Sequence, residues 1–97
     1  MSFTDSEKEV LKVTAEPVKI RLTSEPYIVV TPFGYAPAID IWHLKKKREY
    51  RLIIGASSLC KPIEKLRLAT LGEVFIGLEF WVKKKTDDRK APYIVEE

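Results

Sequence analysis

The sequence contains no asparagine and no glutamine, and its 97 residues include only one cysteine, one histidine and one methionine. A single cysteine excludes an intramolecular disulfide. One cysteine with one histidine also excludes a zinc site built from four such ligands. Missing amides combined with 32% charged residues are typical of hyperthermophilic proteins, so we expect a hyperthermophilic, archaeal source.

Long hydrophobic runs are missing as well. The longest uncharged stretch covers residues 26–39, which is fourteen residues interrupted by Pro32, Gly34 and Pro37. A membrane-spanning helix needs about 20 apolar residues without such breakers. Residues 1–7 are polar and acidic, unlike a signal peptide. We therefore expect a soluble, cytoplasmic protein with a flexible tail over residues 1–7 and a single compact domain over residues 8–97.

The net charge of +3 is unevenly distributed. Residues 1–40 carry four basic and six acidic side chains, whereas residues 42–67 carry eight basic and two acidic ones. The positive charge is therefore concentrated in the middle of the chain, where an anionic partner could bind.

Period-two alternation of apolar and polar residues dominates the chain and predicts a protein rich in β-strands. The expected strands are 18–22, 27–30, 38–44, 49–54, 73–85 and 93–95. Residues 31–37 are expected to form a loop and residues 45–48 a solvated hairpin turn. In the longest expected strand, 73–85, Val74 and Ile76 are predicted to face the core, and Gly77 predicts a bulge.

One helix is predicted, at about residues 58–68. Leu59, Ile63 and Leu66 share one helical face, and Ser57 or Ser58 is the expected N-terminal cap. The fold class is therefore β-rich α+β. If residues 18–30 form one bent strand, the element order is that of an OB-fold, a five-stranded, partly open barrel. A five- to six-stranded antiparallel sheet with one helix on a face fits equally well, and both alternatives stay open.

Catalytic constellations are weak. Cys60 and His43 are expected on different elements, which does not fit a nucleophile beside its base. Asp87 and Asp88 suit capping of a turn, and Asp40 is expected to pair with an arginine across the sheet. No glycine-rich phosphate-binding loop is present. We expect a non-catalytic protein without a cofactor or a metal.

The remaining signal is a set of aromatic rings interleaved with cations. Rings that stack on bases and cations that neutralise phosphates are typical of proteins that bind single-stranded nucleic acid. The expected stacking residues are Phe33, Tyr35, Trp42 and Trp81. The expected phosphate contacts are Lys45, Lys46, Lys47, Arg48, Arg51, Lys83, Lys84, Lys85, Arg89 and Lys90.

These residues predict a protein that binds single-stranded DNA or RNA with little sequence specificity. The alternative is an assembly subunit that forms a homodimer or a larger complex. Its interface would be the strand predicted at residues 73–85 or a face that carries Trp42 and Trp81.

Overall fold

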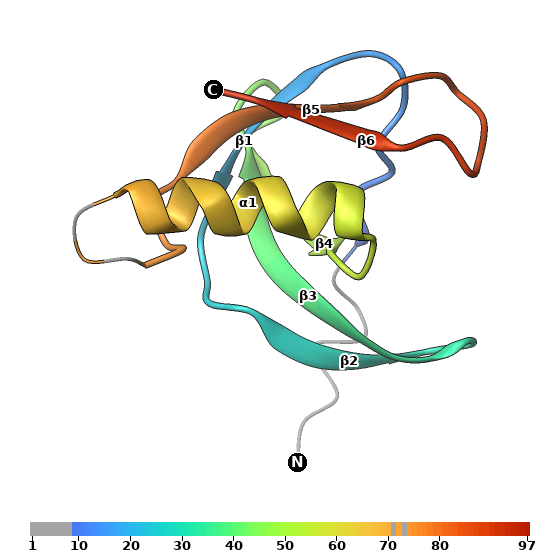
Figure 1. The fold of residues 1–97 in the computed structure, drawn as a ribbon, viewed down its shortest axis with the longest axis horizontal. Helices are drawn as coiled ribbons and strands as arrows, with labels where there is room; N and C mark the ends of the chain where they lie inside the picture. Colours follow the sequence, from blue (N-terminus) through green and yellow to red (C-terminus); the bar gives the residue numbers. More distant parts are fainter. Residues whose placement is uncertain (1–8, 71, 73) are drawn as a thin grey trace.

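The computed structural model describes residues 9–70, 72 and 74–97, so the tail expected at residues 1–7 lies outside the described residues. The described chain forms six strands and one helix (Figure 1). In chain order they are β1 (Val18–Leu22), β2 (Tyr27–Thr31), β3 (Gly34–His43), β4 (Arg48–Ile53), α1 (Ser57–Ala69), β5 (Glu79–Lys84) and β6 (Tyr93–Glu96). The predicted β-rich α+β fold with one helix is therefore confirmed.

All six strands belong to one antiparallel sheet of order β2-β3-β1-β5-β6, in which β4 also pairs with β3. Strand β1 pairs with the end of β3, Leu22 opposite Ile41, whereas β2 pairs with its beginning, Tyr27 opposite Ala38. Because β4 occupies the other edge of β3, strands β1 and β2 follow each other along one edge, as expected of a bent strand. No ladder among the described strands joins β4 to β6, so the sheet does not close into a barrel.

The core lies between the sheet and helix α1. Alternate residues of β1, β3 and β5 point to the helix side, and Ile20, Ile41 and Phe80 are fully buried there. The helix contributes Leu59 and Ile63, which share one face as predicted. Alternation in the strands and 3.6-residue periodicity in the helix thus direct their apolar residues into one layer.

The longest strand is β3, and the expectation of a loop over residues 31–37 is wrong. Pro32 fixes its own φ in a two-residue turn, and Gly34 takes a φ of +116°, where side chains are rare. Ile54 donates its N–H to the carbonyl of Pro37 at 2.9 Å, but proline has no N–H to return that bond. Pro37 therefore ends the β3–β4 ladder instead of interrupting a strand.

The expected strand over residues 73–85 is correct only from Glu79 onward, and Glu73 lies outside the described residues. Val74 and Ile76 lie exposed in the preceding loop, so their predicted core position is wrong. The predicted bulge is present: Gly77 donates to the carbonyl of Leu22, while the N–H of Leu22 donates to Leu78, both at 2.8 Å. Gly77 and Leu78 together therefore oppose the single residue Leu22, which defines a bulge, and Gly77 takes a φ of +97°.

Helix α1 extends one residue beyond the prediction at each end. Its N-terminal cap is Ala56, which makes no side-chain capping bond, so the prediction of a serine cap is wrong. Ser58 instead accepts a hydrogen bond from the N–H of Tyr93 at 3.1 Å and thereby ties the helix to β6. The described residues include no helix with the length and apolar character required to cross a bilayer.

Candidate nucleic-acid interface

The two tryptophans lie on the sheet face opposite the core, as their strand positions predict. Trp42 of β3 pairs with Arg21 of β1, and Trp81 of β5 pairs with Lys19. Because paired residues point to the same face, the two cations of β1 lie between the two rings. Trp42 is half-buried, whereas Trp81 is 41% exposed. Trp81 is therefore the ring of this face that a base can reach more easily.

Arg21 and Lys19 differ in how far they are already engaged. The guanidinium of Arg21 forms an ion pair with Glu79 at 2.6 Å, with both side chains at the surface. The ammonium of Lys19 lies 6.0 Å from the centre of the Trp81 ring, a cation–π arrangement. Lys19 therefore places positive charge beside an exposed aromatic ring, the combination that binds a nucleotide's phosphate and base together.

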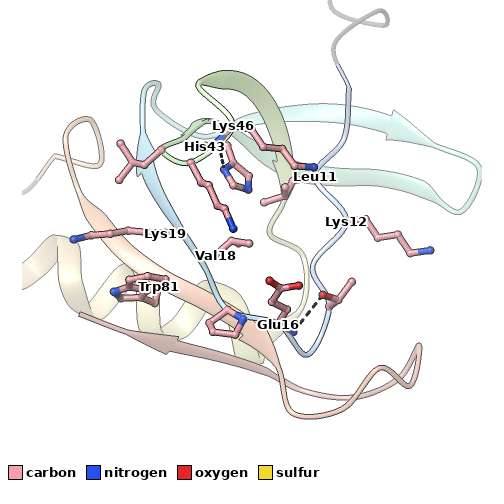
Figure 2. A pocket seen from close by; sticks show the side chains of 12 residues that line it. Leu11, Lys12, Glu16, Val18, Lys19, His43, Lys46 and Trp81 are labelled. Atoms are coloured by element: carbon pink, nitrogen blue, oxygen red, sulfur yellow. Dashed lines mark hydrogen bonds between the residues drawn. The ribbon is translucent and has the colours of Figure 1, made fainter.

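Next to Trp81 lies a cleft of about 820 Å³, which we call the lysine cleft. Trp81 and Lys19 lie on one side of it, and His43 and Lys46 lie across from them (Figure 2). The N-terminal segment that leads into β1 forms a further wall. Four lysines line the cleft, against the single acidic side chain of Glu16: Lys12, Lys19, Lys45 and Lys46. Its volume falls within the range of about 300–1,000 Å³ that ligand pockets occupy.

His43 links the cleft to the turn that carries its lysines. The N–H of Lys46 donates to Nδ1 of His43 at 3.1 Å, so this nitrogen acts as an acceptor and the ring is neutral. Burial lowers the pKa of His43 below its ordinary value of 6.5, and the charge of Lys46 lowers this pKa further. The neutral ring thus fixes the backbone of the turn without adding to its charge.

A second hollow of about 760 Å³ adjoins the lysine cleft, and Leu11, Lys12 and Thr14 line both. Two of the predicted cations, Lys84 and Arg89, line it, together with Asp87. Lys84 donates to the carbonyl of Arg89 at 3.1 Å, and its ammonium lies 5.4 Å from the centre of the Tyr93 ring. The N-terminal segment therefore lines both hollows and adds Lys12 to each of them, beside Lys45 and Lys46 in the first and Lys84 and Arg89 in the second.

The predicted stacking residues do not all meet. Phe33 and Tyr35 lie at the tip of the β2–β3 hairpin, and Tyr35 is seven residues before Trp42 on the same strand. At a rise of about 3.3 Å per residue, these two residues are roughly 23 Å apart. They also point to opposite faces, since their positions differ by an odd number. Phe33 and Tyr35 therefore belong to a different surface from the two tryptophans.

Two of the three predicted arginine contacts, Arg48 and Arg51, are engaged within the protein. Arg51 is buried, and its Nε donates to the hydroxyl of Tyr27 at 3.0 Å. That hydroxyl donates to Asp40 at 2.5 Å, so Tyr27 bridges the acid and the base that face each other across β3 and β4. Arg48 is exposed, forms an ion pair with Glu9 at 2.8 Å and lies 5.3 Å from the Tyr50 ring. Arg51 is thus placed as a structural residue.

The other predicted cations surround the two hollows without lining them. Lys47 lies in the β3–β4 turn with a φ of 55°. Lys83 lies half-buried on β5, where it pairs with Ile94, and Lys85 and Lys90 are exposed around the β5–β6 loop. They can contribute to the electrostatic field, but the described geometry gives them no shared pocket.

Two lysines of the cleft, Lys12 and Lys19, are absent from the sequence-based prediction. Alternation in β1 places Lys19 on the outer face of the sheet, and the same argument places Trp81 there. The sequence therefore contained a signal that these two residues could lie close together. The sequence contained no signal for Lys12, because its segment is held by tertiary contacts. The backbone N–H of Leu11 donates to the carbonyl of Arg51, and the backbone N–H of Arg51 donates to the carbonyl of Glu9, both at 2.8 Å.

No group of three or more potential metal ligands occurs among residues 9–70, 72 and 74–97. Cys60 lies half-buried in α1, on a different element from His43. No protein-family model, no curated protein and no solved structure matches this chain. A functional interpretation therefore depends on the geometry of the site.

Proposed function

We propose that the protein binds single-stranded nucleic acid, DNA or RNA, without catalysing a reaction. The observation that carries this proposal is the lysine cleft, where four lysines from three segments of the chain line one hollow together with the exposed ring of Trp81. Trp81 stacks on a base, and Lys12, Lys19, Lys45 and Lys46 bind the neighbouring phosphates. A cytoplasmic location and a hyperthermophilic archaeal source belong to the same proposal.

The proposed mode of binding has little sequence specificity. Side-chain amides, which read adenine by paired hydrogen bonds, are missing from the sequence. Lysine binds phosphate as a point charge, and a tryptophan face accepts any base. The affinity therefore comes from backbone charge and stacking.

The number of lysines sets the expected salt dependence. A single strand releases counterions so that log K falls with log salt by about 0.7 for each phosphate neutralised. Four lysines give a slope of about −2.8, which corresponds to a loss of roughly 50-fold between 50 and 200 mM salt. Stacking of one base on Trp81 contributes on the order of 1–3 kcal/mol and is less sensitive to salt.

Fluorescence anisotropy of a labelled oligonucleotide, at several salt concentrations, tests the proposal. Trp81→Ala should weaken binding about 5- to 150-fold, the equivalent of one stacked base, and leave the salt slope unchanged. A double variant, Lys45→Glu with Lys46→Glu, should weaken binding and reduce the slope by about 1.4. These two signatures distinguish the role of the ring from that of the charges.

The matched control is Lys61→Glu with Lys65→Glu, an equal change of charge at exposed positions of α1. It should leave the salt slope within about 0.3 of the wild-type value, because neither residue lines the cleft. Absence of binding to single-stranded DNA and to RNA at 50 mM salt would refute the proposal. Equal losses in the control and cleft variants would refute the site.

A further inference from the structure

The β2–β3 hairpin exposes an apolar surface that the proposed function does not use. Ile28 and Val30 of β2 are 64% and 76% exposed, and Phe33 and Tyr35 are 89% and 81% exposed. Ile28 pairs with Pro37 and Val30 pairs with Tyr35, so the side chains of these two pairs point to one face of the hairpin. We call residues 27–37 the hairpin arm; Figure 1 shows it extending away from β5 and β6.

The outer edge of the arm is also free. Among the described strands, β2 pairs only with β3. The carbonyl of Pro37 points toward β4, where it accepts from Ile54, so the opposing residue Ile28 makes no ladder bond with Pro37. By the alternation of an antiparallel ladder, the N–H and C=O groups of Ile28 and Val30 both point to the free edge.

Edge strands of this kind are normally protected by charges, prolines or bulges. Residues 27–31, which form β2, contain no charge and no proline; Pro26 and Pro32 flank the strand. Residues 26–39 form the longest uncharged stretch of a chain in which 32% of residues are charged. Contact between two copies of this segment therefore brings no like charges together, despite the net charge of +3.

We propose that the hairpin arm binds a second copy of this chain, with the two β2 strands antiparallel around a twofold axis at Val29. In this register Ile28 of each copy faces Val30 of the other, and each such pair exchanges two backbone hydrogen bonds. Pro26 and Pro32, which have no N–H, face each other at the two ends of this ladder, so the bonding pairs between them keep both of their hydrogen bonds. The edge is thus self-complementary in this register.

The same register aligns the tip of each arm with a hollow of the other copy. Two residues beyond Val30, Pro32 lies beside Pro26 of the second copy, and the Phe33 ring follows. Pro26 lines an apolar hollow of about 400 Å³ between the arm and α1, together with Pro37, Ile54 and Ile63. The exposed Phe33 ring therefore reaches the entrance of this hollow.

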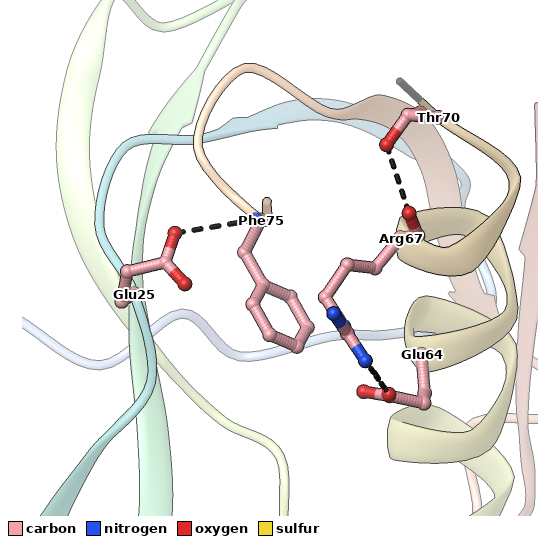
Figure 3. A network of polar contacts seen from close by, with 5 residues as sticks. All are labelled: Glu25, Glu64, Arg67, Thr70 and Phe75. Atoms are coloured by element: carbon pink, nitrogen blue, oxygen red, sulfur yellow. Dashed lines mark hydrogen bonds and ion pairs between the residues drawn. The ribbon is translucent and has the colours of Figure 1, made fainter. Parts of the chain in front are cut away.

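Phe75 forms a further wall of this hollow, between Glu25 and helix α1 (Figure 3). Its N–H donates to Glu25 at 3.2 Å, and its ring lies under Arg67, whose guanidinium carbon is 5.2 Å from the ring centre (Figure 3). Arg67 in turn forms an ion pair with Glu64. The hollow therefore has a fixed shape before a ring enters it.

The area of the arm suits a dimer. An aromatic side chain buries about 150–250 Å², so Phe33 and Tyr35 alone supply roughly 300–500 Å² per copy. Ile28, Val30 and the strand edge bring the total toward the ~800 Å² per partner of a standard interface. Because no residue of the arm lines the lysine cleft, the dimer leaves both clefts open.

The sequence offers the strand at residues 73–85, or the face of Trp42 and Trp81, as an alternative dimer interface. Strand β5 is paired with β1 along one edge and with β6 along the other, so it has no free edge. The hairpin arm, in contrast, carries β2 at an end of the strand order, where a second copy can extend the sheet.

Sedimentation velocity of the full chain over about 1–500 µM tests the proposal. The wild-type protein should sediment as a dimer at high concentration, and Val30→Lys should sediment as a monomer because a charge then lies on the free edge. Leu68→Lys, at an exposed position of α1, is the matched control and should remain dimeric. A wild-type monomer at every concentration, or a dimer that survives Val30→Lys, overturns the proposal. So does loss of the dimer in the control.

A cysteine pair tests the register itself. In a chain that carries Cys60→Ser, Val29→Cys should form an intermolecular disulfide under mild oxidation. The two Val29 residues face each other in a pair without hydrogen bonds, where the Cα separation of about 4.5 Å permits a disulfide. Ile28→Cys is the control: its copies lie diagonally, about 7–8 Å apart, and should not crosslink. Equal crosslinking of both variants overturns the register. Unchanged oligonucleotide affinity in Val30→Lys separates this result from the proposed function.

Discussion

Replacing Tyr27 by phenylalanine tests whether the polar bridge between β2, β3 and β4 stabilises the fold. The hydroxyl of Tyr27 donates to Asp40 at 2.5 Å and accepts from Arg51 at 3.0 Å. The substitution removes one oxygen atom and both hydrogen bonds. Arg51 is buried and loses one of its partners, while the phenylalanine ring keeps the packing of the tyrosine ring.

The expected cost is about 2–3 kcal/mol in the free energy of unfolding. A hydrogen bond to a charged group contributes about 1.5–3 kcal/mol, so two such bonds set an upper limit of about 6 kcal/mol. The cost is lower because Asp40 and Arg51 face each other across the ladder and keep their mutual attraction. For a domain of this size, the melting temperature should fall by about 10–20 °C.

The pH dependence gives a signature that loss of packing alone would not produce. Burial raises the pKa of Tyr27 above its ordinary value of 10.0, and the bond to Asp40 raises this pKa further. Above pH 10 the unfolded chain therefore loses its proton first, and the wild-type protein loses stability until the pH exceeds the pKa of the folded state. The difference between the wild type and Tyr27→Phe should shrink over this range.

Urea unfolding monitored by circular dichroism, at pH 7 and from pH 9 to 11.5, measures both effects. Tyr35→Phe is the matched control, since it removes the same oxygen from an 81% exposed ring and should change stability by less than about 0.5 kcal/mol. If Tyr27→Phe costs no more than this control, the bridge does not stabilise the sheet. Oligonucleotide affinity should be unchanged, because Tyr27 and Arg51 do not line the lysine cleft.

Two further predictions concern pH and temperature. His43 has a pKa below 6.5, so the unfolded chain binds the proton first on acidification, and stability should fall as the pH drops below 6.5; an imidazole NMR titration that gives a pKa above 6.5 would contradict this. If the source is hyperthermophilic, calorimetry should give a melting temperature above about 90 °C, and a value of about 45–65 °C would exclude this source.

Local patterns predicted those elements whose residues pair or pack close in sequence. The alternation in β1 and the hairpin turn at Lys45, Lys46 and Lys47 agree with the prediction, because a strand face and a hairpin turn depend on neighbouring residues. Arg48, also expected in the turn, is instead the first residue of β4. The bulge at Gly77 was also found, because only glycine adopts its φ of +97° readily.

The prediction failed where a residue's meaning depended on distant partners. The prolines predict a loop at Pro37. The β3–β4 ladder ends at this residue, so its missing N–H interrupts no further bond between the two strands. Val74 and Ile76 continued the apolar alternation of β5, yet the bulge at Gly77 turns the chain away and leaves them exposed. The periodicity showed that these side chains are apolar, but it could not show whether they are buried.

For the candidate site, the sequence by itself determined the kinds of residues available for binding: cations and aromatic rings, without side-chain amides. It also placed Trp42 and Trp81 on the outer face, since alternation in a strand fixes the face of each side chain. Only the tertiary structure decided which of these residues share a surface. It placed Lys19 beside Trp81 and Lys12 in the same cleft, paired Arg51 with Tyr27, and placed Phe33 and Tyr35 on a separate arm. These groupings depend on strand order and register, which arise from contacts between segments far apart in the chain.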